Sequence, residues 1–429
     1  MRFWLLIAGL CWCSSSLAVT PTSDPIARSA ESIRDELVKT RRDFHQHPEL
    51  SNREERTAGV VAERLRALGL TVRTNIARHG VIGILKGGKP GPVVAWRADM
   101  DALPIQESYE SDYRSQNAGV MHACGHDAHT AIGLGIATIL SRMQKDLAGT
   151  VVFVFQPAEE GAPAGEKGGA ALMLEEGALD DPKPGAIFGL HVWPLLPAGK
   201  IGWHSGPALA ASDRFVATVH GKKVHASTPQ FGVDAVLAAA QAVIAIQNIR
   251  SRRTDTLQPL VITVGSIHGG NRFNIIADEV LLEGTVRTLD SELQDRIPGM
   301  MQEVLTHATA TVGATADLSY EKLVPATVNN PELTQATLPS LRRAVGADNL
   351  VESPPIMGAE DFSYFAQKIP GFYFLLGVSN QSRGITAMTH TPTFDLDEES
   401  LVVGVRAGAA VLLDWLAAPS SGHLYSAPR

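Results

Sequence analysis

One stretch of the chain determines the class of the fold: Thr150-Val151-Val152-Phe153-Val154-Phe155-Gln156-Pro157-Ala158-Glu159-Glu160-Gly161. Its first half, residues 150–155, is a continuous apolar run, which is typical of a strand that is buried on both faces of a sheet. Its second half turns the chain and then presents two adjacent carboxylates. A strand that is buried on both faces needs helices on both sides, so the stretch predicts an α/β fold.

Helical and strand patterns alternate outward from this stretch in both directions. The alternation predicts a central sheet covered by helices on both faces. Helices are expected at 24–69, 128–143, 331–344, 361–367 and 397–416, and strands at 71–72, 81–85, 93–96, 186–190 and 372–376.

The middle of the chain has a different order of elements. Between residues 207 and 322 the order is strand, helix, strand, strand, helix, strand, which is a split βαβ (ferredoxin-like) unit. The elements are expected at 214–220, 233–250, 260–267, 279–287, 293–311 and 316–320. The sequence therefore predicts a main domain in two parts, 24–206 and 323–417, that is interrupted by a smaller α+β domain at 207–322 and followed by a flexible tail at 418–429.

Residues 1–18 have the pattern of a secretory signal peptide. Arg2 is followed by a short apolar run and then by small residues that end at Ala18. We expect cleavage after Ala18 and a periplasmic or secreted protein, with an uncleaved anchor as the alternative. No later segment is expected to be long and apolar enough to cross a membrane. The formal net charge of −8 argues against nucleic acid as the main partner.

Only one cysteine remains after cleavage, because Cys11 and Cys13 leave with the signal peptide. The remaining Cys124 cannot form an intrachain disulfide. A lone thiol in an oxidising compartment is a liability unless it is buried or bound to a metal.

Cys124 lies in the densest group of metal-type side chains: Met121-His122-Ala123-Cys124-Gly125-His126-Asp127-Ala128-His129. Thiolates and imidazoles are good ligands for zinc and similar divalent ions. Gly125 allows the chain to bend so that Cys124 and His126 can point the same way. The segment therefore predicts a metal site directly before a helix.

Three further positions carry the same kind of chemistry. Glu159 and Glu160 follow the strand 150–155, and ligands gather at the carboxyl ends of strands in α/β folds. One carboxylate can bind a metal while its neighbour takes a proton from water. The alternative is a solvated acidic turn. His191 ends a second strand, where a lone histidine is more often structural than a metal ligand. His390 lies in a loop and is a weak signal when taken alone.

Six motifs in this order resemble the aminoacylase and hippurate hydrolase branch of the metallopeptidases that also include glutamate carboxypeptidase. This branch includes the plant auxin-conjugate hydrolases, and the similarity extends from about residue 30 to 416. The motifs are Trp96–Pro104, His122–His129, Gln156–Gly161, Gly189–Pro194, Met357–Phe362 and His390–Asp395.

The resemblance implies two divalent metal ions per subunit, zinc or manganese, with cobalt or nickel as alternatives. The implied ligands are Cys124, His126, Glu160, His191 and His390. Glu159 is implied as the general base for a metal-activated water.

Four further polar residues of these motifs are expected to orient imidazoles rather than to bind metal. Asp99 stands where other branches of the family have the histidine of a His-x-Asp pair, and Asp101 is the aspartate of that pair. Asp127 and His129 are given the same role.

The inserted domain carries three more candidates. The resemblance implies that His225 comes from the partner subunit of a homodimer and polarises the scissile carbonyl. It also implies that Asn274 contacts the substrate, and Arg287 is a candidate for holding the substrate carboxylate. From the residues alone, a surface histidine and a turn-stabilising asparagine would be preferred.

Together these features predict metal-dependent hydrolysis of the amide bond of N-acyl amino acids, with an exported metallo-carboxypeptidase or dipeptidase as the alternative. Two other classes stay open. A thiol hydrolase with Cys124 as nucleophile leaves the acidic pair and both distant histidine motifs unexplained. A binding protein without catalysis is disfavoured by the intact Glu159.

Overall fold

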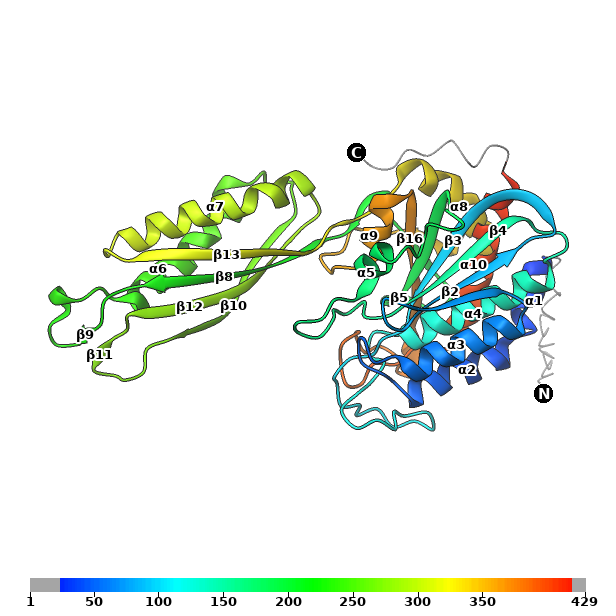
Figure 1. Cartoon of the computed structure of the whole chain (residues 1–429), viewed down its shortest axis with the longest axis horizontal. Helices are drawn as coiled ribbons and strands as arrows, with labels where there is room; N and C mark the ends of the chain where they lie inside the picture. Colours follow the sequence, from blue (N-terminus) through cyan, green and yellow to red (C-terminus); the bar gives the residue numbers. More distant parts are fainter. Residues whose placement is uncertain (1–23, 419–429) are drawn as a thin grey trace, which may run out of the picture.

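The computed structural model describes residues 24–418, so the expected signal peptide and residues 419–429 of the expected tail lie outside the described residues. The described chain forms two bodies (Figure 1). A large α/β domain carries both ends, and an elongated inserted domain extends from it. This arrangement agrees with the α/β fold and the inserted α+β unit that the sequence predicts.

The large domain is built on a mixed sheet of eight strands in the order β1-β2-β4-β3-β5-β16-β6-β15. The central strands β4, β3, β5 and β16 are parallel to one another. Their carboxyl ends therefore meet at one edge of the sheet, where α/β proteins place their sites. The strands are β1 (Thr71–Ile76), β2 (Gly80–Lys86), β3 (Lys89–Asp99), β4 (Ala148–Gln156), β5 (Ala186–Pro197), β6 (Ile201–Trp203), β15 (Leu350–Glu352) and β16 (Gly371–Ser379).

Helices cover both faces of this sheet (Figure 1). Most of them pack on one face, around a core that includes Trp96, Phe153 and Phe374. The other face is covered by α5 and α9, whose Met173 and Phe365 belong to a separate apolar cluster. The helices are α1 (Pro25–Glu31), α2 (Arg34–Gln46), α3 (Glu55–Ala67), α4 (His126–Arg142), α5 (Gly169–Glu175), α8 (Pro331–Val345), α9 (Phe362–Lys368) and α10 (Glu399–Ala417).

Helix α10 corrects one expectation from the sequence. With a mean hydropathy of 1.6 over its apolar window, it is long and apolar enough to cross a membrane by length and composition. In the structure 72% of that window is buried, and the helix packs against α4 and α8. Its hydropathy is therefore explained by its place in the core of the domain, where a helix can be apolar on nearly all sides.

The inserted domain has a four-stranded antiparallel sheet in the order β10-β12-β8-β13. Helices α6 and α7 pack together and contribute to one apolar cluster with the sheet, which is separate from the core of the large domain. The elements follow the predicted split βαβ order: β8 (Ala211–His220), α6 (Ala235–Asn248), β10 (Leu260–Gly269), β12 (Glu279–Thr288), α7 (Ser291–Ala310) and β13 (Thr315–Val324).

Two small pairs of strands lie at the opposite ends of the inserted domain. At the junction with the large domain, β7 (Gly206–Leu209) pairs with β14 (Thr327–Asn329). At the far tip, β9 (Val224–His225) pairs with β11 (Ile275–Ile276) (Figure 1). The sequence predicted none of these short strands.

Strand β5 is longer than predicted. The sequence places the end of the strand at Leu190, but β5 continues to Pro197, so His191 lies within the strand and not at its end. The continuation is explained by parallel pairing with β16, in which His191 lies opposite Leu375.

Candidate active site

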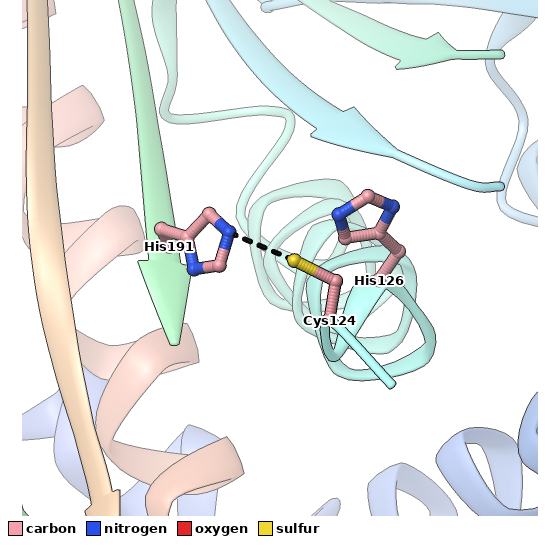
Figure 2. A group of neighbouring side chains, drawn as sticks. All are labelled: Cys124, His126 and His191. Atoms are coloured by element: carbon pink, nitrogen blue, oxygen red, sulfur yellow. Dashed lines mark hydrogen bonds between the residues drawn. The ribbon is translucent and has the colours of Figure 1, made fainter. Parts of the chain in front are cut away.

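The predicted ligands come from four separate parts of the chain and meet at the carboxyl edge of the parallel strands. Cys124 precedes α4, and His126 is the first residue of that helix. Glu160 follows β4, His191 lies within β5, and His390 lies in the loop before α10. Figure 2 shows Cys124 and His126 at the start of α4, with the thiol directed toward His191 on β5.

The sharp bend between Cys124 and His126 depends on Gly125. This residue has φ of +88°, a left-handed conformation that favours glycine. A Cβ atom at this position would lie 2.4 Å from Val192 Cγ2, on the strand that carries His191. The start of α4 and strand β5 therefore approach so closely that only glycine fits between them.

The side chains that could bind metal, called the donor cluster below, form two groups that share the thiol of Cys124. In the first group, the Cys124 Sγ lies 3.4 Å from His191 Nε2, and His126 completes the set. In the second group, His390 Nε2 lies 3.3 Å from the Cys124 Sγ and 3.2 Å from Glu160 Oε1. Within each group the ligand atoms lie within 4.8 Å of one another.

Two buried atoms in this cluster lack a hydrogen-bond partner, namely His126 Nε2 and Glu160 Oε1. The other ring nitrogen of His126 lies 3.2 Å from Asp101, and His191 Nδ1 lies 2.6 Å from the carbonyl oxygen of Val192. Donation of both Nδ1–H groups to these oxygens leaves the Nε2 lone pairs directed into the site. Buried lone-pair atoms without a partner are costly in free energy unless they bind a cation. A set of thiolate, imidazole and carboxylate groups fits divalent metal ions.

Asp101 positions both glutamates and one imidazole at the same time. Its two carboxylate oxygens accept hydrogen bonds from the backbone N–H groups of Glu159 (3.1 Å) and Glu160 (3.0 Å). It also lies against the ring of His126 and accepts a hydrogen bond from Ser51 (2.7 Å). These contacts match the orienting role that the sequence predicted for Asp101.

Asp99 holds a different histidine from the one that Asp101 holds. Its carboxylate lies 2.6 Å from His129 Nδ1, while the Nε2 of His129 accepts a hydrogen bond from the backbone N–H of Val192 (2.9 Å). Both ring nitrogens of His129 are thus used within the protein, which leaves no lone pair for a metal. Asp127 is likewise engaged away from the donor cluster, with Arg41 (2.8 Å) and His45 (2.7 Å).

A buried charge network that the sequence did not predict lies behind Glu159. Arg97 is fully buried, and its guanidinium donates to Asp99 (2.5 Å), Glu360 (2.8 Å) and Asp361 (2.9 Å). The backbone N–H of Asp361 in turn points at Glu159 Oε1 (3.4 Å). Arg97 therefore connects the aspartate that orients His129 with the loop that contacts the expected general base.

Negative charge is concentrated in the site. Burial raises the pKa of the Cys124 thiol, and the charges of Glu160 and Glu159 raise it further. Burial also raises the pKa of Glu159, to which Glu360 and Glu160 contribute by repulsion. A divalent cation reverses these effects because it stabilises thiolate and carboxylate forms.

The donor cluster opens into a cleft of about 960 Å³ between the large domain and the near end of the inserted domain. Its floor contains Cys124, Glu159, Glu160, His191 and His390. Arg287, on β12 of the inserted domain, also lines the cleft and is half-buried there. The remaining walls include apolar side chains: Leu209, Leu323, Ile356, Met357, Tyr364 and Leu375.

The structure does not bring His225 or Asn274 to this cleft within one chain. Both lie at the tip of the inserted domain, on the side away from the large domain (Figure 1). Ser212 at the start of β8 lines the cleft, and His220 at its end lies eight residues further on. At ~3.3 Å per residue this strand alone separates the tip from the cleft by about 26 Å.

The local geometry of the tip suits donation from His225. The backbone N–H of Ser227 donates to His225 Nδ1 (3.1 Å), so the neutral ring carries its proton on Nε2. This side chain is exposed, and the Nε2–H is available as a donor. The side-chain oxygen of Asn274, one residue from β11, is buried without a hydrogen-bond partner.

Comparison with known proteins gives concordant results. Residues 95–414 match the family described as peptidase family M20/M25/M40. The chain is 41% identical to IAA-amino acid hydrolase ILR1-like 2 of Arabidopsis thaliana, over 91% of this chain and 87% of that protein. It is 38% identical to thermostable carboxypeptidase 2 of Saccharolobus solfataricus, over 91% of this chain and 98% of that protein.

The fold comparison points the same way. A crystal structure from Bacillus subtilis, described as a dinuclear metal-binding peptidase of the M20 family, superposes with a TM-score of 0.78. It shares 35% sequence identity, and the match covers 90% of this chain and 99% of that one. The match extends over both the large and the inserted domain, and the chain belongs to peptidase family M20/M25/M40.

Proposed function

We propose that this enzyme hydrolyses the amide bond of N-acyl amino acids at a dinuclear metal site in the cleft. The observation that carries this function is the convergence of five donor side chains beside a sixth residue, Glu159. This carboxylate reaches the donor cluster, with its Oε2 at 3.9 Å from His126 Nε2. A separate carboxylate of this kind is what proton transfer to and from water requires.

Cys124, His126, Glu160, His191 and His390 would hold the two ions, zinc or manganese in the first instance. Bound there, the ions supply Lewis acidity, which lowers the pKa of water and polarises the carbonyl. Glu159 accepts the proton from the attacking water and delivers it to the nitrogen of the leaving amino acid.

The substrate needs two further contacts. The Nε2–H of His225 can donate to the carbonyl oxygen as negative charge develops on it. Arg287 lies in the cleft as a half-buried guanidinium that makes no side-chain hydrogen bond to residues 24–418, and it can bind the carboxylate of the substrate.

The names of the two curated relatives fit one substrate class. A peptide that is cut by a carboxypeptidase and an N-acyl amino acid both present an amide bond next to a free carboxylate. The substrates of an amidohydrolase and of a carboxypeptidase therefore differ only in the group on the acyl side of the amide bond. We favour the N-acyl amino acid, because the cleft walls on both domains include apolar side chains.

A substrate panel tests this function. Metal-reconstituted enzyme is assayed on N-acetyl, N-benzoyl and indole-acetyl amino acids and on dipeptides, before and after treatment with a chelator. We expect turnover of the N-acyl substrates that is lost with the metals and restored by Zn²⁺ or Mn²⁺. Faster turnover of dipeptides would favour the alternative, and turnover that survives metal removal would refute both.

We further propose that the enzyme is a homodimer in which the partner supplies His225. Among the described residues, eleven large apolar side chains are exposed, and nine of them lie in the inserted domain. Val236, Leu237 and Ile244 lie on α6, while Val261 and Ile267 lie on the edge strand β10. An apolar helix face beside a free sheet edge is suited to pairing with a second copy.

Mixed dimers test the origin of His225. Glu159→Gln and His225→Ala proteins are each expected to have low activity. After subunit exchange, one site in each mixed dimer has both residues intact if His225 acts across the dimer. Activity well above either parent supports the proposal, whereas verified mixed dimers without a gain contradict it.

Export is the last element of the proposal. The pattern of residues 1–18 supports cleavage after Ala18. Sequencing of the mature protein should give an N-terminus near Val19 in a periplasmic or secreted fraction, and recovery of Met1 in a cytosolic fraction would contradict it.

A further inference from the structure

The tip of the inserted domain carries a side chain that nothing in its own chain explains. Phe273 precedes Asn274 and is 94% exposed, the highest value among the exposed large apolar side chains. Its neighbours are fixed, since Asn274 accepts a backbone hydrogen bond from Ala226 (3.1 Å) and Ile275 pairs with His225. An aromatic ring of this size is costly to leave in water, so its exposure suggests that it binds elsewhere.

We propose that Phe273 of one subunit enters the cleft of the other and forms a wall of the pocket for the acyl group. This inference rests on the proposed function, because it uses the same tip that would deliver His225. It extends that function to a substrate class, namely N-acyl amino acids with a bulky apolar acyl group.

The position of Phe273 relative to His225 selects the acyl side. Across the β9–β11 pair, His225 lies opposite Ile275, two residues from Phe273. We infer that Phe273 lies near the same substrate when His225 contacts the carbonyl oxygen, because both belong to the same small tip. The substrate carboxylate is assigned to Arg287 of the subunit whose residues form the cleft. The acyl group of the substrate is then the part for which no protein contact has been assigned.

Charge and polarity of the two surfaces are complementary. The tip presents cationic side chains, including Lys222 and Arg272, both exposed. The cleft lining includes the exposed carboxylate of Glu321, besides carboxylates that are paired with Arg97 or Arg53 or are proposed to act at the metal site. Such complementarity guides encounter and fixes orientation. The apolar cleft residues Ile356 and Met357 offer a surface against which an aromatic ring and an acyl chain can both pack.

The substitution Phe273→Ala tests the specificity without a risk to folding, because the side chain makes almost no contact within its own subunit. For an indole-acetyl or benzoyl amino acid we expect KM to rise by about tenfold or more, since small changes in an apolar pocket already discriminate by ~10–200-fold. For the N-acetyl derivative of the same amino acid, kcat/KM should change less than about twofold.

The control is Leu257→Ala, which removes a side chain that is 90% exposed in the same domain but lies beside the junction with the large domain. It should leave both substrates unaffected. An equal loss on both substrates, or no loss on either, would overturn the assignment of Phe273. The role of His225 is judged separately, because His225→Ala should lower turnover of every substrate.

Mixed dimers locate the pocket. In a mixture of Glu159→Gln and Phe273→Ala subunits, the mixed dimer has its intact Glu159 on the Phe273→Ala chain. A partner contribution predicts normal KM for the bulky substrate at that site. When the Glu159→Gln/Phe273→Ala double variant is mixed with unmodified subunits, sites of mixed dimers should show the raised KM. The opposite pattern would place Phe273 in its own cleft and refute the inference.

Discussion

Removal of the buried guanidinium of Arg97 is the most demanding test of how the site is built. In the structure this side chain neutralises three buried carboxylates, Asp99, Glu360 and Asp361, and has no access to solvent. The substitution Arg97→Met keeps most of the volume and removes the charge. All three carboxylates then lose their cationic partner while they remain buried.

The expected loss follows from these contacts. Removing one partner of a buried ion pair costs ~3–5 kcal/mol, because the remaining charge stays desolvated. Three carboxylates raise this cost, whereas protonation offsets part of it: burial and repulsion from Glu360 already raise the pKa of Asp361 to about 7. We therefore expect Arg97→Met to lower the free energy of unfolding of the large domain by about 3–5 kcal/mol.

Urea denaturation, followed by tryptophan fluorescence and circular dichroism, measures this loss on metal-free and metal-loaded protein. The control is Arg343→Met, which breaks a half-exposed ion pair with Asp414 in the same domain and should cost at most ~1 kcal/mol. Asp99 orients His129, which accepts a hydrogen bond from the backbone of Val192 next to the proposed ligand His191. Arg97→Met should therefore lower the amount of bound metal as well. A variant that unfolds within about 1 kcal/mol of the control would refute the assignment of Arg97 as the charge that holds this network together.

Three further substitutions test individual residues. Glu159→Gln should retain bound metal and lose ~10²–10⁴-fold in kcat, measured by turnover and metal analysis, and loss of metal would contradict its role as a base. Cys124→Ser should lower metal occupancy and activity, with partial recovery in excess Mn²⁺, and a thiol that titrates freely in metal-loaded wild-type protein would contradict ligation. Gly125→Ala should lower both the free energy of unfolding and the metal content, because the added Cβ atom would collide with Val192. The control Gly119→Ala has φ of +76° but open space around it, so it should lower the free energy of unfolding by only ~1–2 kcal/mol through backbone strain.

The order and type of the main elements could be predicted because they depend on short-range patterns. The apolar residues 150–155 form most of β4, and the predicted helix 128–143 corresponds to α4. The end of β5 could not be predicted in this way. After Leu190 the polar His191 and the prolines Pro194 and Pro197 interrupt the apolar run, and the strand continues through pairing with β16, which lies more than 170 residues further along the chain.

The same distinction applies to the site. The donor residues lie in local motifs, so residue type and position relative to strands identified them as candidates. The contacts of Arg97 with Glu360 and Asp361 join residues more than 260 positions apart, and no local pattern contains such a pairing. One signal was present: Arg97 directly follows the apolar run 93–96, and a buried arginine requires carboxylate partners.

The place of β16 in the sheet has a consequence for how the protein is made. This strand lies between β5 and β6, in the interior of the sheet, but it is synthesised after the whole inserted domain. A nascent chain therefore holds β5 with an open edge while the inserted domain, which has its own core, can already fold. The sheet can close only when residues 371–379 are present, and His390 follows them in the chain. Truncated chains would accordingly expose an aggregation-prone strand edge and lack the ligand His390. A complete metal site can therefore form only in a chain that has been synthesised beyond His390.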